Sequence, residues 1–225
     1  MLLVAYAAAK EGDGLRLDGV APLALGVGKT ASASTLTDAL VRNPEIRGVL
    51  LFGVCGAYRR RAGGSESALA VGDLCVVDSE WLADEGVDTP DGFLSLSDLD
   101  LGSEGGAGAV GPFAADQLRS AAAADQLGAP RVHGVTVSTC NAADTRAERV
   151  VRRSQAVWPG VERDLVETME GAAVAWVCGW RRMPWLQVRC VSNWTGDRCW
   201  GQWQLETAID RVQRAVRTLV TGAPP

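Results

Sequence analysis

A glutamate stands at the head of an apolar segment in the C-terminal part of the chain. The segment VETMEGAAVAW, residues 166–176, places Glu170 directly before a run of small apolar residues. A lone carboxylate that enters an apolar core costs several kcal/mol unless a partner satisfies it. Glutamates are also common at helix starts, where free N–H groups and the helix dipole stabilise negative charge. Glu170 is therefore either a structural residue at a helix start or the anion of a binding site.

Four further clusters of polar residues and glycines follow apolar runs that are predicted to be strands. Open α/β sheets bind ligands beyond the carboxyl ends of their strands, so these clusters are candidate binding residues. Turn chemistry alone would explain each cluster taken singly, although glycine also lets a ligand approach the backbone closely. The clusters are AAAKE at 7–11, which brings Glu11; GVGKTASAS at 26–34; LFGVCGAY at 51–58, which contains Gly53 and Gly56; and CVSNWTGDRCW at 190–200, which contains Asn193, Asp197 and Arg198.

Two familiar chemistries are not expected from these residues. The turn GVGKTASAS contains a Gly-Lys-Thr triplet, but a phosphate-binding loop needs a second glycine five positions before Gly28-Lys29, where Leu23 stands. Nucleoside triphosphate binding is therefore not predicted. The only histidine, His133, precedes an apolar run that suits a buried strand, which disfavours a Ser-His-Asp triad.

The composition of the chain limits its partners. The 225 residues are 47% apolar and 22% charged, as in a globular enzyme with a sizeable core. A net charge of −5 without a basic block excludes nucleic acid as an expected partner. The apolar start of the chain has no cationic lead and is too short to cross a membrane, so no membrane partner is expected. Six cysteines without CxxC spacing predict reduced thiols in a cytoplasmic protein and no zinc site.

The elements that must position these residues follow from the hydrophobic pattern. Short apolar runs bounded by glycine predict strands buried on both faces, and a capping box of Thr145 with Glu148 predicts one helix start. The glycine-rich stretches 61–68 and 103–111 are expected to be surface loops. Strands are expected at 2–8, 23–27, 48–54, 74–78, 132–138 and 186–192, and helices at 29–41, 112–126, 145–154, 170–181 and 202–219.

Strands that alternate with helices predict a largely parallel sheet with helices on both sides, so the expected fold class is α/β. No stretch of the chain has the composition of a linker. We therefore expect a single domain over residues 1–225.

The order of the motifs resembles that of the nucleoside phosphorylase and nucleosidase superfamily. An early strand leads to a glutamate, then come GVGK, a glycine turn with VGD downstream at 71–73, MEGAAVA, and a strand that ends in Ser-Asn. These motifs cover most of the chain, and MEGAAVA with the Ser-Asn strand is the most specific pair. Within the superfamily the segments DEGVDTPDGFLSL, 84–96, and SNWTGDRCWGQW, 192–203, are most similar to futalosine hydrolases, enzymes of a menaquinone pathway.

The resemblance implies roles for the candidate residues. It implies that Glu170 binds the ribose 2′-hydroxyl, that Met169 packs beneath the sugar, and that Glu11 orients and deprotonates an attacking water. An anion near the ribose stabilises the positive charge that develops there when the N-glycosidic bond breaks. Gly53 and Gly56 are the expected backbone contacts to the substrate.

The residue after Ser192 is expected to select the purine. Adenine-cleaving relatives place an aspartate there, whereas this chain has Asn193. Hypoxanthine presents acceptors at both O6 and N7, which suits the N–H groups of a carboxamide. Asn193 therefore favours a 6-oxopurine, and Asp197 is a second candidate for contacting or protonating the base.

The resemblance thus implies a three-layer α/β/α sandwich around a mixed, largely parallel sheet, and hydrolysis of futalosine to release hypoxanthine. It implies a small nucleoside substrate, no metal or organic cofactor, and a homo-oligomer, a dimer or larger. Phosphorylases of the superfamily recruit phosphate with arginines early in the chain, whereas GVGKTASAS offers only Lys29, so hydrolysis is favoured. The alternatives are a methylthioadenosine/S-adenosylhomocysteine-type nucleosidase, a purine nucleoside phosphorylase, or a nucleoside-binding module without catalysis.

Overall fold

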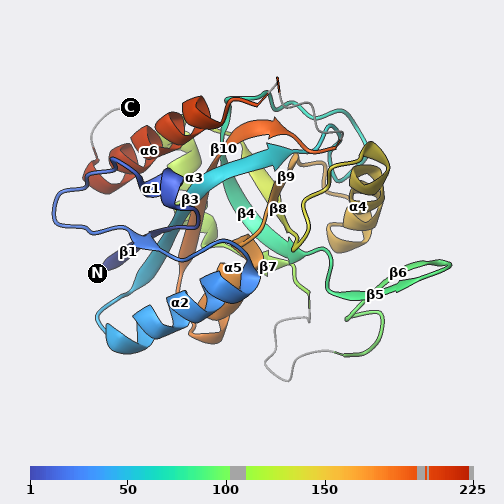
Figure 1. The fold of residues 1–225 in the computed structure, drawn as a ribbon, viewed down its shortest axis with the longest axis horizontal. Helices are drawn as coiled ribbons and strands as arrows, with labels where there is room; N and C mark the ends of the chain where they lie inside the picture. Colours follow the sequence, from blue (N-terminus) through green and yellow to red (C-terminus); the bar gives the residue numbers. More distant parts are fainter. Residues whose placement is uncertain (102–109, 197–200, 202, 223–225) are drawn as a thin grey trace.

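The computed structural model describes residues 1–101, 110–196, 201 and 203–222 (Figure 1). Strands and helices alternate along most of this length. The strands are β1 Leu2–Tyr6, β2 Leu23–Ala24, β3 Gly48–Ala57, β4 Leu74–Leu82, β5 Gly86–Thr89, β6 Gly92–Ser95, β7 Phe113–Ala114, β8 Arg131–Thr136, β9 Leu165–Thr168 and β10 Trp185–Trp194. The helices are α1 Ala9–Gly12, α2 Lys29–Arg42, α3 Gln117–Leu127, α4 Asp144–Val157, α5 Gly171–Trp180 and α6 Leu205–Thr221.

The main sheet is mixed and largely parallel, as predicted. Its hydrogen-bonded order is β10-β4-β8-β9-β3-β1-β2, with β7 beside β4. An additional parallel pairing joins β10 to β3, so five strands of this sheet close into a ring. β5 and β6 form a separate hairpin that projects from the body of the fold (Figure 1).

Helices cover both faces of the sheet, which confirms the predicted α/β class and its layers. One core contains Leu36 and Leu40 of α2 with Val174 and Cys178 of α5. The opposite core contains residues of α6 and α3, such as Val212, packed against β3 and β10. Figure 1 shows α2 and α5 on one side of the sheet and α6 on the other. Among the described residues, no helix is both long enough and apolar enough to cross a membrane.

The predicted elements differ from the structure in a few places. The helix expected at 112–126 begins only at Gln117, after the short strand β7. The predicted capping box of Thr145 with Glu148 was wrong. The helix α4 begins at Asp144 with Ala143 as its N-cap residue, so Thr145 lies inside the first turn. Strand β9 was not predicted, nor was the hairpin β5–β6. The stretch 61–68 is a loop as expected, but Ala62 within it is fully buried.

The topology brings distant segments to one edge of the sheet. β1, β3 and β10 run parallel, so their carboxyl ends lie together. Glu11 follows β1, Gly56 lies near the end of β3, and Asn193 lies near the end of β10. β9 runs antiparallel to β3 and pairs Glu167 with Gly56, which adds the segment that leads into Met169 and Glu170.

Candidate active site

A cavity of about 200 Å³ lies at this edge of the sheet. Five of the predicted site residues line it: Glu11, Gly56, Met169, Glu170 and Asn193. Asp197 lies outside the described residues.

Glu11 is held by backbone donors from the turn after β1 and from β3. It lies in the short helix α1 and is 5% exposed. Its Oε2 accepts hydrogen bonds from the amides of Ala7 and Ala8, at 3.1 and 2.9 Å, and its Oε1 accepts one from Val54, at 2.8 Å. These bonds fix the carboxylate at the cavity wall. The position suits a base that takes a proton from a bound water.

Arg189 is the cation beside Glu11. It lies in β10, is 1% exposed, and lines the cavity. Its Nη1 donates to the carbonyl of Val54 at 3.2 Å, while Nε and Nη2 have no hydrogen-bond partner among the described residues. A side chain at Gly53 would overlap both the Glu11 carboxylate and the Arg189 guanidinium. Gly53 therefore makes room for these two groups and does not itself line the cavity.

Glu170 is the N-cap residue of α5 and is 5% exposed. Its Oε1 accepts a hydrogen bond of 2.8 Å from the amide of Gly28, in the turn GVGK. Burial raises the pKa of the Glu170 carboxyl, and the charge of Arg189 and the Gly28 amide oppose that rise. The buried carboxylate thus has backbone donors and a nearby guanidinium, and Glu170 lines a cavity that could hold a sugar hydroxyl.

A second buried carboxyl lies beneath the start of α5. Glu80 is fully buried and accepts hydrogen bonds of 2.8 Å from both Thr136 and Gln187. The Thr136 hydroxyl in turn accepts the amide of Ala172, in the first turn of α5. Burial raises the pKa of Glu80 to about 7, and Arg189 opposes that rise. This network anchors the turn that carries Glu170.

The far end of the cavity contains Asn193. Its Oδ1 accepts the Ser192 hydroxyl at 2.8 Å, and its Nδ2 donates to the carbonyl of Trp194 at 3.0 Å. An amide nitrogen carries two N–H groups, and this contact uses one of them. Asn193 therefore keeps one N–H group that could donate to a ligand in the cavity.

Sequence reasoning missed Arg189 and a cluster at the same end, Glu167 with Tyr58 and Asn141. Glu167 lines the cavity and accepts a hydrogen bond of 2.7 Å from the Tyr58 hydroxyl. Asn141 donates to Glu167 through its amide, at 3.0 Å, and through its side chain. Burial raises the pKa of Glu167, and the donors from Tyr58 and Asn141 oppose that rise. A charged residue inside an apolar strand, as at Arg189, is the signal that could have found these residues.

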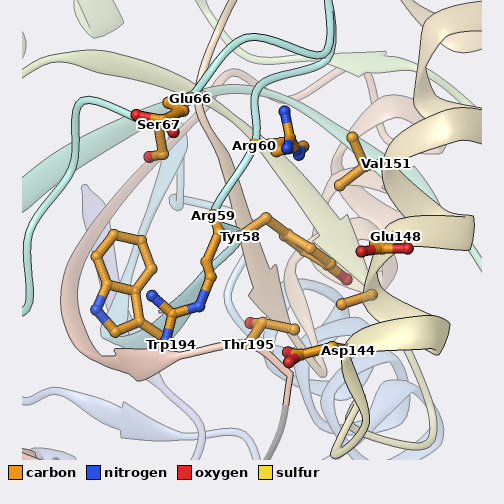
Figure 2. A pocket seen from close by; sticks show the side chains of 11 residues that line it. Tyr58, Arg59, Arg60, Glu66, Ser67, Asp144, Glu148, Val151, Trp194 and Thr195 are labelled. Atoms are coloured by element: carbon orange, nitrogen blue, oxygen red, sulfur yellow. The ribbon is translucent and has the colours of Figure 1, made fainter.

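A larger cavity of about 430 Å³ lies on the other side of Trp194, which lines both. Figure 2 shows the guanidinium of Arg59 beside the indole of Trp194, and the two are 5.0 Å apart. Exposed charges of both signs, such as Arg60 and Glu66, line this space. Apart from Trp194 and Tyr58, it shares no residue with the groups described above, and we assign the candidate site to the smaller cavity.

The charges of the candidate cavity are unequal. Its described lining contains three carboxylates, Glu11, Glu167 and Glu170, and one cation, Arg189. Lys29, the only basic residue of the turn GVGK, is neutralised by Asp84 and Glu85, each at 2.6 Å. In the described part of the chain, no group of three or more His, Cys, Asp or Glu side chains could hold a metal ion. The site therefore suits a neutral or cationic ligand better than a phosphate dianion.

Comparison with protein families gives one match that covers most of the chain. The family described as Phosphorylase superfamily matches residues 18–221.

Curated relatives narrow this result. A futalosine hydrolase of Thermus thermophilus is 30% identical over 207 residues, which are 92% of this chain and 84% of that protein. Futalosine hydrolases of Acidothermus cellulolyticus and Streptomyces coelicolor are 32% and 34% identical over 70% of this chain. These two alignments span 61% of each relative, less than two thirds of its length.

Solved structures share the fold. A methylthioadenosine/S-adenosylhomocysteine nucleosidase of Streptococcus pneumoniae, in complex with 8-aminoadenine, matches with a TM-score of 0.75 and 18% identity. A futalosine hydrolase mutant of Helicobacter pylori matches with a TM-score of 0.74 and 16% identity. Each match covers 99% of both chains. At this identity the two likenesses show the fold alone.

Proposed function

Because the chain belongs to the phosphorylase superfamily and, within it, to the futalosine hydrolase family, we propose that it hydrolyses the N-glycosidic bond of futalosine and releases hypoxanthine. The observation that carries the proposal is the cavity itself. It joins a backbone-held carboxylate, Glu11, to a buried guanidinium, Arg189, and to a second carboxylate, Glu170. These are the groups that water attack on a ribose requires.

In the proposed reaction, a water bound between Glu11 and Arg189 attacks the anomeric carbon. Its proton passes to Glu11, a new C–O bond forms, and the C–N bond to the purine breaks. Glu170 binds the ribose 2′-hydroxyl above Met169, and its charge stabilises the cationic ribose more in the transition state than in the ground state.

The electron pair of the broken bond leaves with the purine. Asn193 stabilises the leaving base by donating to O6, and N7 takes up a proton. Asp197 is the proposed donor of that proton.

Water is proposed as the nucleophile in place of phosphate for an electrostatic reason. Three carboxylates around one guanidinium repel a dianion. Lys29 is already paired with two acidic residues, so the turn GVGK has no spare charge for phosphate. A phosphorylase would need more positive charge here.

The experiment is to incubate the purified protein with futalosine, inosine and methylthioadenosine, each with and without phosphate. We expect hypoxanthine and a free sugar product from futalosine at equal rates in both buffers. A sugar 1-phosphate product, or a requirement for phosphate, would overturn hydrolysis. Preferred cleavage of methylthioadenosine would overturn the assignment of futalosine as the substrate.

We also propose that the protein is a homo-oligomer, a dimer or larger. α2 and α5 pack together and carry the exposed apolar side chains Val41, 61% exposed, and Trp180, 73% exposed. Exposed apolar side chains on two packed helices suit a protein interface. Light scattering would measure the mass in solution.

A further inference from the structure

Glu167 and Asn193 both line the cavity, and both are strand neighbours of one glycine. On the sheet, Gly56 of β3 pairs with Glu167 of β9 on one side and with Asn193 of β10 on the other. Residues paired across neighbouring strands point to the same face of a sheet. The two outer strands are separated by two strand spacings, or about 10 Å. A side chain at Gly56 would overlap the Thr195 hydroxyl and crowd the Asn193 amide nitrogen, so glycine makes room for these two side chains.

The Glu167 carboxylate has acceptor capacity left for a ligand. An ionised carboxylate offers about four acceptor sites, two on each oxygen. The Tyr58 hydroxyl and the Asn141 side chain both donate to Oε2, and the Asn141 amide donates to Oε1. Among the described contacts, Oε1 therefore keeps one acceptor site. The three donors also fix the direction of the carboxylate, so the site is built before a ligand arrives.

The two sides of Gly56 thus offer opposite hydrogen-bonding groups. Asn193 offers a donor, as described above, and Glu167 offers an acceptor. A 6-oxopurine presents the matching pattern, since O6 and N7 accept and N1–H donates. Adenine does not match on the Glu167 side, because its N1 is an acceptor.

We propose that Glu167 accepts a hydrogen bond from N1–H of a 6-oxopurine whose O6 and N7 face Asn193. This inference rests on the proposed function and adds a specificity-determining residue to it. Adenine in the same position would bring the N1 lone pair against the carboxylate and leave both groups unsatisfied. Such a mismatch is expected to reduce kcat/KM roughly tenfold to a hundredfold.

The test is Glu167→Gln, measured with futalosine and with its 6-amino analogue. We expect kcat/KM for futalosine to fall roughly tenfold to a hundredfold, while that for the 6-amino analogue changes by less than about threefold or rises. Equal losses for both substrates would overturn the proposal and leave Glu167 a structural residue.

A matched control is Asp164→Asn, three residues earlier on the chain. Asp164 is also a buried carboxylate, 6% exposed, which pairs with Arg61 outside the cavity. Its loss is expected to lower stability and to leave the preference between the two purines unchanged. A change in preference as large as that of Glu167→Gln would overturn the assignment.

Binding of the free bases separates this inference from the proposed function. Calorimetry of the parent protein and of Glu167→Gln with hypoxanthine and with adenine needs no turnover. We expect Glu167→Gln to weaken hypoxanthine binding and to spare adenine binding, whether or not the protein cleaves futalosine. Failure to cleave futalosine alone would contradict the proposed function, and equal weakening for both bases would contradict the role of Glu167.

Discussion

The amide of Gly28 donates a hydrogen bond of 2.8 Å to Oε1 of Glu170, although 142 residues separate the two along the chain. The turn GVGK and the motif MEGAAVA are therefore parts of one structure. The turn supplies a fixed backbone donor to the carboxylate in place of a phosphate site. Gly28 has a φ of 92° and a ψ of 161°, a conformation that is essentially restricted to glycine.

Glu170→Gln is expected to lower kcat about a hundredfold, because one preorganised charge beside the developing ribose cation is lost. The amide keeps the size of the side chain, so the folded structure should persist. Steady-state kinetics on futalosine measure the effect, and thermal unfolding checks the fold. Near-normal turnover in a folded variant would mean that Glu170 has only a structural role at the start of α5.

Gly28→Ala is expected to reduce kcat/KM about tenfold, because an alanine in this conformation carries a strain of about 1–3 kcal/mol and shifts the amide that binds Glu170. Gly92→Ala is the matched control. Gly92 has a φ of 135°, has open space around it, and lies in the hairpin β5–β6. Equal loss of activity in both variants would mean that Gly28 matters only for folding.

Asn193→Asp is expected to narrow or reverse the preference for futalosine over its 6-amino analogue. The carboxamide of Asn193 donates to O6 or N7, whereas a protonated carboxyl suits N7 beside a 6-amino group. A buried mismatch of about 1–3 kcal/mol corresponds to roughly tenfold to a hundredfold discrimination. The measurement is kcat/KM of the parent and of Asn193→Asp for futalosine and for its 6-amino analogue. If the parent protein cleaves both equally well, Asn193 does not select the base.

His133 is expected to make the protein less stable in acid. It stacks on Trp158, with ring centroids 4.3 Å apart, and its Nδ1 bonds to the Ser79 hydroxyl at 2.9 Å. Burial, with the charge of Arg131, lowers its pKa from 6.5 to about 4. Between these two values the unfolded chain binds the proton and the folded protein does not, so the free energy of unfolding falls as pH falls.

His133→Gln removes this contribution. Between pH 7 and pH 4, the free energy of unfolding of the parent should fall by about 3 kcal/mol more than that of the variant. Urea unfolding at the two pH values measures the difference. Parallel losses in both proteins would show that His133 titrates alike in the folded and unfolded states.

Much of the fold could be predicted because buried strands leave a local signal. The apolar runs located β1, β3, β4, β8 and β10, and the alternation with helices gave the α/β class. β9 escaped prediction because its four residues, Leu165–Thr168, include a glutamate and a threonine. The capping box failed because Asp144, one residue earlier, already occupies the first helical position.

The candidate site was predicted in part. Glu11, Gly56, Glu170 and Asn193 lie at or just beyond the ends of strands that meet at one edge of the sheet. The order of their motifs gave their expected roles, which stay predictions. Arg189 was missed because apolar neighbours in β10 marked it as part of a core strand. The contacts of Glu11 with Val54 and of Glu170 with Gly28 depend on pairing between distant segments, which local patterns do not specify.

The pairing of β10 with both β3 and β4 also determines when the site can exist. During synthesis the N-terminal strands leave the ribosome first. The position between β3 and β4 then waits for a strand from the last part of the chain. That strand brings Arg189 and Asn193, so a nascent chain that ends before β10 does not contain the complete cavity. Assembly of the catalytic groups is thus a late, non-local event, of the kind that slows folding.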